Sequence, residues 1–160
     1  MTTEKSKATD EAQIRQLMDD WARAIQAKDA NGVVSNYAPE VVSFDIAPPL
    51  RQRVGKDEYK KGLEGWFSTF QDSIGYEIHE LEIAVGGDLA LAHSIIRLSG
   101  KRKSADGVDI KVQEGEDTDG WMRSTVGFRK IEGKWMITHE HSSVPMYMDG
   151  SNKAAIDLKP

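Results

Sequence analysis

Residues 133–146, GKWMITHEHSSVPM, contain five side chains spaced two residues apart, and this segment decides the predicted fold. Successive side chains of a strand point to opposite faces, so a regular strand would place all five on one face. They are Trp135, Ile137, His139, His141 and Ser143. That face begins apolar and ends polar, which predicts a strand that joins the core at one end and lines a pocket at the other.

The preceding residues predict the partners of this strand. A strand over residues 121–131 would form a hairpin with it, with Glu132-Gly133 as the turn. Two further long strands are predicted over residues 74–85 and 89–102. Residues 103–120 are rich in glycine and acidic side chains, and they predict either a long hairpin or a loop with a short extra strand at residues 108–112.

Three helices and one strand are predicted before this run of strands. The first helix should begin at Thr9 or Asp10, because Asp10 and Gln13 have the spacing of a capping box. The other segments are a helix over residues 30–37, a strand over 41–46 and a helix over 56–70. The order predicts an α+β domain in which three N-terminal helices pack on a strongly curved, mostly antiparallel sheet around a conical cavity.

Composition limits the function classes. The chain has 160 residues with a net charge of −5, which disfavours a general nucleic-acid binder. It has no cysteine, so disulfides, zinc-thiolate sites and thiol nucleophiles are excluded. No apolar run approaches the roughly 20 residues that cross a bilayer, and no apolar signal segment begins the chain. We expect a cytoplasmic protein with one domain over residues 9–147, and tails at residues 1–8 and 148–160.

Several short motifs accompany this element order: KDANGV at residues 28–33, YAP at 37–39, GGDLA at 86–90, FRK at 128–130, EGKW at 132–135 and HEHSS at 139–143. Together they resemble the NTF2-like superfamily, in particular its SnoaL-like and ketosteroid-isomerase-like branch, over residues 10–147. The resemblance implies a cone-shaped pocket and a homodimer packed through the sheet. The segments 96–98 and 133–141 are also similar to the association domain of calcium/calmodulin-dependent kinase II, a non-catalytic assembly module of the same fold.

The resemblance implies a catalytic role for Asp45, which matches the position of a carboxylate that shuttles protons in the isomerases and cyclases. A carboxylate in an apolar cavity has a raised pKa and becomes a usable base near neutral pH. Alternatively, Asp45 ends a strand and caps the next turn. The oxyanion donors of the isomerases are replaced by Trp21 and Val126, so we do not expect steroid isomerisation.

Histidines are the next candidates. His139 and His141 would share the face of Trp135, and His93 lies within a predicted strand. A His-x-His pair with a carboxylate can bind a metal, but the additional ligands of cupin-like sites are missing, so we predict no metal. His141 is a candidate acid or base. Alternatively, such a histidine hydrogen-bonds to a backbone carbonyl or to Ser143.

Two arginines fall inside predicted strands. Arg97 and Arg123 alternate with apolar residues, and a buried arginine needs an anionic partner. Arg97 matches a pocket arginine of the kinase association domain, and Thr125 takes the position of another. If they face inward, they favour a ligand with a carboxylate. Alternatively, they form cross-strand pairs with acidic residues on the surface.

Aromatic residues complete the predicted pocket. The candidates for its lining are Tyr37, Phe44, Trp66 and Trp121. Trp66 belongs to a helical stripe that is more typical of a core, whereas Trp121, close to Arg123, could stack on a ligand ring.

Two functions fit these residues. The first is a cofactor-independent isomerase, cyclase or lyase for a small hydrophobic carbonyl compound, with Asp45 as the base and His141 or Arg123 polarising the oxygen. The second is a non-catalytic module that binds a small carboxylate-bearing ligand in the pocket and dimerises through the sheet. His93, Arg97, Thr125 and His139 would contact the ligand in either case.

Overall fold

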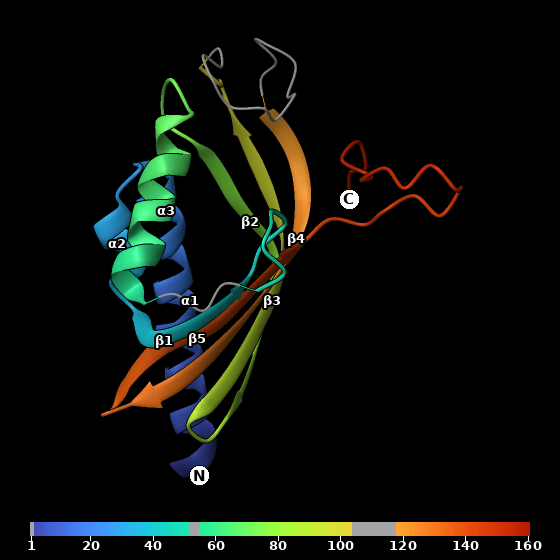
Figure 1. Cartoon of the computed structure of the whole chain (residues 1–160). Helices are drawn as coiled ribbons and strands as arrows, with labels where there is room; N and C mark the ends of the chain where they lie inside the picture. Colours follow the sequence, from blue (N-terminus) through green and yellow to red (C-terminus); the bar gives the residue numbers. More distant parts are fainter. Residues whose placement is uncertain (1, 52–54, 104–117) are drawn as a thin grey trace.

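The computed structural model describes residues 2–51, 55–103 and 118–160, and within them three helices lie on one side of a five-stranded sheet (Figure 1). The helices are α1 (Thr2–Gln26), α2 (Ala30–Val34) and α3 (Lys56–Ser68). The strands are β1 (Tyr37–Phe44), β2 (Gly75–Gly86), β3 (Leu89–Gly100), β4 (Thr118–Ile131) and β5 (Lys134–Ser143). The predicted α+β architecture is confirmed, whereas the extra strand predicted at residues 108–112 lies outside the described residues.

The strand order in the sheet is β1-β5-β4-β3-β2. Three neighbouring pairs are antiparallel, and only β1 runs parallel to its neighbour, β5. The face toward the helices, here called the inner face, carries the buried side chains, and the opposite face is the outer face. Beyond β5, the chain extends away from the helices (red in Figure 1) and forms a small hairpin with a bridge between Met146 and Ala154.

Helix α1 supplies one wall of the core. Its buried residues recur at intervals of three and four, as in an amphipathic helix, and they include Ile14, Met18, Trp21 and Ile25. The helix begins at Thr2, earlier than the predicted start, so Asp10 lies inside it and does not cap it. Among the described residues, no helix is long and apolar enough to cross a membrane.

Asp10 instead connects α1 to the last hairpin. Its Oδ1 accepts hydrogen bonds from Lys130 Nζ at 2.7 Å and from Trp135 Nε1 at 3.1 Å. The hydrogen bond from Lys130 is the main cause that lowers the pKa of Asp10. A buried carboxylate that is paired and hydrogen-bonded in this way fixes how α1 lies on the sheet.

A β-bulge at Thr138 interrupts β5. On β4, Gly127 pairs with His139, and the next residue, Phe128, pairs with Ile137, so Thr138 has no residue opposite it. Its Oγ1 donates to the carbonyl oxygen of Gly127 at 3.3 Å. Because the bulge inserts one extra residue, it resets the alternation of side chains between the two faces.

The predicted face of β5 is therefore wrong beyond the bulge. Trp135 and Ile137 are buried on the inner face as expected. After Thr138 the inward residue is Glu140, which retains only 8% of its exposure, while His139 and His141 lie on the outer face. The alternation of apolar residues in the sequence gives no sign that Thr138 is an extra residue in the strand. Because of this one residue, Glu140 is buried in place of His139.

Candidate active site

A buried carboxyl group, that of Glu140, forms the centre of the site. It accepts hydrogen bonds from three hydroxyl groups: Tyr37 at 2.5 Å, Ser43 at 3.0 Å and Tyr59. Tyr37 and Ser43 lie on β1, which runs beside β5, and Tyr59 reaches the carboxyl from α3. The parallel pairing of β1 and β5, together with α3, thus brings four polar side chains from distant parts of the chain to one point.

The Tyr37 hydroxyl is fixed from both sides. It accepts a hydrogen bond from Trp21 Nε1 at 3.1 Å and donates its own proton to Glu140. Trp21 in turn packs edge-on against Tyr76, with the ring centroids 5.5 Å apart. Trp21, at the position of an oxyanion donor in the isomerases, is therefore buried in the core and orients the polar cluster.

Burial is the largest influence on the pKa of Glu140, and it raises that pKa above its ordinary value. The hydrogen bonds from the three hydroxyls oppose this rise, because they stabilise the carboxylate. The pKa values of Tyr37 and Tyr59 are raised well above their ordinary range, first by burial and then by the charge of Glu140. The cluster thus combines one carboxyl that takes up a proton more readily than usual with two phenols that keep theirs.

Asp45 does not belong to this cluster. It is exposed just beyond β1, and its Oδ1 accepts a hydrogen bond from the backbone amide of Ile46 at 2.6 Å. This is the turn-capping arrangement named above as the alternative. Its charge nevertheless contributes to the raised pKa of Glu140, so Asp45 lies within electrostatic reach of the buried carboxyl.

The other predicted histidines and their neighbours lie on the outer face. His93, Thr125 and His141 occupy one row across β3, β4 and β5, and Phe44 continues it on β1. Nε2 of His93 lies 3.5 Å from a Glu82 carboxylate oxygen. These side chains are on the opposite side of the sheet from Glu140, and their predicted roles in ligand binding stay untested.

His139 adopts the alternative that was considered for it. Its Nδ1 lies 2.9 Å from the carbonyl oxygen of Val42 on the neighbouring strand. The rings of His139 and His141 both pack edge-on against Phe44, at centroid distances of 4.8 and 5.7 Å. In the described part of the chain, no group of three or more His, Asp or Glu side chains is arranged to hold a metal ion.

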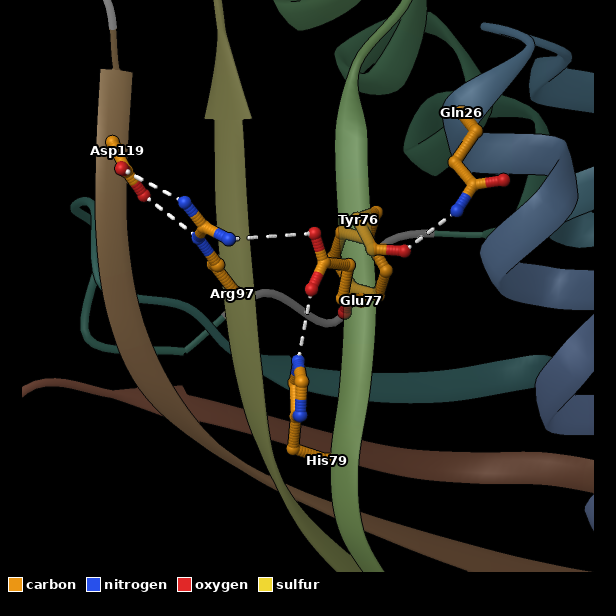
Figure 2. Close-up of polar contacts among 6 residues, drawn as sticks. All are labelled: Gln26, Tyr76, Glu77, His79, Arg97 and Asp119. Carbon is orange, nitrogen blue, oxygen red and sulfur yellow. Dashed lines mark hydrogen bonds and ion pairs between the residues drawn. The ribbon is translucent and has the colours of Figure 1, made fainter. Parts of the chain in front are cut away.

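Arg97 finds its anionic partners on the protein surface. Its Nε and Nη2 lie 3.0 and 3.1 Å from the carboxylate of Asp119 on β4, and Nη1 lies 3.7 Å from Glu77 on β2 (Figure 2). Trp121 lies beside this group, with its ring centroid 6.0 Å from Arg97 Cζ. Arg123 is exposed on the same strand as Trp121. Neither arginine therefore contacts Glu140. Arg97 forms the cross-strand surface pair with acidic residues that was the alternative prediction.

Two predicted pocket aromatics do lie on the helix side of the sheet. Tyr37 is buried and hydrogen-bonds to Glu140. Trp66 is half-buried, packs against the core and contacts Phe67 and Phe70. Sequence reasoning missed Glu140, although the signal was present: it is the acidic residue within the HEHSS motif.

A separate surface groove of about 420 Å³ lies between α1 and the β4–β5 turn. Its lining residues are Gln13, Gln16, Leu17, Asp20, Asn36, Gly133, Lys134 and Trp135. None of the four residues of the buried cluster is among them. The groove therefore lacks the acid and the hydroxyls, and the cluster around Glu140 is the better candidate for chemistry.

Comparisons with known proteins agree with the architecture. The family model of the SnoaL-like domain matches residues 14–147. An NTF2-like protein of unknown function from Pseudomonas putida KT2440 is 33% identical, with 96% of this chain and 98% of that chain covered and a TM-score of 0.78. Comparison with curated proteins gives no match.

Two more distant structures, each 19% identical, share the fold. One is a proposed scytalone dehydratase from Novosphingobium aromaticivorans, with 97% of this chain and 95% of that chain covered and a TM-score of 0.73. The other is a proposed calcium/calmodulin-dependent protein kinase II association domain from Xanthomonas campestris, with coverage of 81% and 84% and a TM-score of 0.62. The chain therefore belongs to the SnoaL-like family of the NTF2-like superfamily.

Proposed function

We propose that this protein is a cofactor-independent cytoplasmic enzyme that moves a proton on a small carbonyl compound, in an isomerisation or an elimination, with Glu140 as the acid–base group. The observation that carries the proposal is the buried Glu140 carboxyl, whose pKa is raised while three hydroxyls hold it. A carboxyl tuned in this way is suited to general acid–base catalysis. The similarity to a proposed dehydratase supports the same class of reaction.

Each residue would have a defined part in the reaction. The carbon–hydrogen bond next to the carbonyl breaks, its proton passes to Glu140, and its electron pair moves toward the carbonyl oxygen. As Glu140 becomes protonated, Tyr59, which is half-buried, would release its hydrogen bond to that carboxyl and donate its one hydroxyl proton to the carbonyl oxygen instead. Glu140 then returns the proton, either to another carbon or to a leaving hydroxyl group, which departs as water. Tyr37, held by Trp21, would keep the carboxyl in place.

Asp45 is the second candidate for the base, and one substitution separates it from Glu140. We expect Asp45→Asn to retain turnover within about threefold, because Asp45 influences Glu140 only through its charge. The measurement is the absorbance of the conjugated product formed from a panel of 3-hydroxycarbonyl compounds. A loss of 100-fold or more in Asp45→Asn, with Glu140→Gln unaffected, would move the role to Asp45.

We also propose that the outer face of the sheet is the interface of a homodimer. This face carries large apolar side chains that are exposed to solvent, including Leu89 at 60% exposure and Leu91 at 47%. Arg123 and Arg129 lie on the same face as Glu82, so two copies can oppose unlike charges across a two-fold axis. A binding or assembly module of the same fold would use this face as well.

Replacing Leu91 by arginine tests the interface. We expect the wild type to sediment as a dimer and Leu91→Arg to sediment as a monomer, because a charge at the centre of an apolar interface is costly. Sedimentation velocity over a range of concentrations gives the result, and Leu158→Arg, on the C-terminal segment, is the matched control. A wild type that stays monomeric at every concentration would contradict this proposal.

A further inference from the structure

Three serines form a row on the inner face of the sheet, next to Glu140. Ser94 on β3 pairs with Ser124 on β4, and Ser124 pairs with Ser142 on β5. Ser142 follows Glu140 by two residues on β5. On β4, Ser124 precedes Val126, the residue paired with Glu140, by two. The serines therefore point to the same side of the sheet as the carboxyl. Neighbouring strands lie about 4.8 Å apart, which spaces the hydroxyls evenly beside the acid.

Ser94 and Ser124 are buried, Ser142 is half-buried, and none of the three hydroxyls has a hydrogen-bond partner among the described residues. Ser94 retains 5% and Ser124 retains 4% of its exposure. Hydrogen bonds to other described residues are found for Ser43 but not for the side chains of Ser94, Ser124 or Ser142. Buried hydroxyls are nearly always hydrogen-bonded, so serines that find no partner in the described part of the chain are expected to bind water or a ligand.

The serine oxygens also retain some accessible surface. In the described part of the chain, no fully buried side-chain nitrogen or oxygen lacks a hydrogen-bond partner. Since the three serines have none, their oxygens must keep some contact with space that water enters. Tyr59, Leu63 and Trp66, spaced along one side of α3, are only half-buried, as expected if this space lies between α3 and the sheet.

We infer that the serine row is a specificity site that binds the oxygen atoms of the ligand at a distance from the reacting carbon. A serine hydroxyl can donate and accept, so the row fits hydroxyl and carbonyl oxygens alike and disfavours a plain hydrocarbon. A ligand that leaves buried polar groups unpaired is discriminated against strongly. The ligand class is therefore a small compound with at least two oxygen substituents, not an apolar one.

The inference rests on the proposed function only for the identity of the reacting carbon. It can therefore be tested by measuring ligand affinity in a variant that does not catalyse the proposed reaction. The probes are 1,3-dihydroxybenzene and toluene, which share a ring and differ in their oxygens, titrated by NMR into the Glu140→Gln protein. We expect the dihydroxy compound to bind at least tenfold more tightly than toluene. The double substitution Ser94→Ala with Ser124→Ala should weaken its binding about tenfold and leave that of toluene unchanged.

Ser143→Ala is the matched control, because Ser143 is the next residue on β5 and points to the outer face. It should leave both affinities unchanged. The serine substitutions remove hydroxyls that have no partner within residues 2–51, 55–103 and 118–160, so the variants should fold as the wild type does, which amide NMR spectra would verify. The inference is overturned if the two probes bind with equal affinity. It is also overturned if the double variant binds the dihydroxy probe as tightly as the protein with both serines, which is expected if the row holds ordered water alone. Serine-dependent binding, together with a wild type that turns over none of the 3-hydroxycarbonyl compounds, would contradict the proposed reaction alone.

Discussion

Glu140→Gln should lower kcat by about 10²- to 10⁴-fold, the usual contribution of a positioned acid–base group, and leave the protein folded. Glutamine has nearly the shape of glutamate, and its amide oxygen can still accept hydrogen bonds from Tyr59 and Ser43, whereas its amide nitrogen only donates. It cannot take up the proton that the reaction releases. The measurement is kcat and KM with a turned-over 3-hydroxycarbonyl compound. An equal fall in kcat and kcat/KM would indicate an interaction made only in the transition state.

Glu132→Gln is the matched control for this loss. Glu132 is an exposed acid in the turn between β4 and β5, and its replacement removes the same charge far from the buried cluster. We expect its kinetic constants to equal those of the wild type. Full activity of Glu140→Gln would show that the buried carboxyl serves the fold and not the reaction.

The same substitution also changes how stability depends on pH. Because burial raises the pKa of Glu140 in the folded state, folding favours the protonated form. That contribution is fully present below the ordinary glutamate pKa of about 4.3, and it is lost as pH rises through the folded-state pKa. The stability of the wild type relative to Glu140→Gln should therefore fall as pH rises from 4 to 8. Urea unfolding of both proteins over this range measures the difference, and a difference independent of pH would contradict the raised pKa.

Tyr37→Phe should lower the free energy of unfolding by about 1–3 kcal/mol, the cost of leaving a buried polar group without its partner. The lost hydroxyl is the acceptor for Trp21 Nε1 and a donor to Glu140. Removing that donor also destabilises the carboxylate, so the pKa of Glu140 should rise further. The acidic limb of the pH–rate profile would then move to higher pH.

Tyr147→Phe provides the comparison for this second prediction. Its hydroxyl donates to Asp157 at 2.7 Å in the segment beyond β5, outside the core. We expect its urea midpoint and its pH–rate profile to match those of the wild type. If Tyr37→Phe moved the midpoint but left the profile unchanged, Tyr37 would act in folding alone.

Much of the fold follows directly from local patterns in the sequence. The apolar residues of α1 recur at helical spacing, and Glu132-Gly133 forms the turn of the last hairpin with positive backbone φ at both residues. These signals depend on residues close together in the chain, so a single sequence contains them. The start of α1 was missed because Asp10 has the appearance of a cap, while its actual partners, Lys130 and Trp135, lie more than 100 residues away.

The site was harder to predict, because an inserted residue and long-range contacts determine it. Regular alternation placed His139 inward, and the bulge at Thr138 buries Glu140 instead. Arg97 shows the opposite case, since its need for an anionic partner was predicted and is met by Asp119. The sequence left two partners possible for Arg97, a ligand carboxylate or an acidic side chain on the surface. Strand register decides between them, and a single sequence does not reveal the register.

The parallel pairing of β1 with β5 has a consequence for synthesis of the protein. The hydrogen bond between Tyr37 and Glu140 joins residues 103 positions apart. Contacts of such long sequence separation form slowly, because a large loop must close before they stabilise anything. In a chain emerging from the ribosome, Tyr37, Ser43 and Tyr59 are synthesised long before Glu140, so the buried polar cluster would be completed only late in folding.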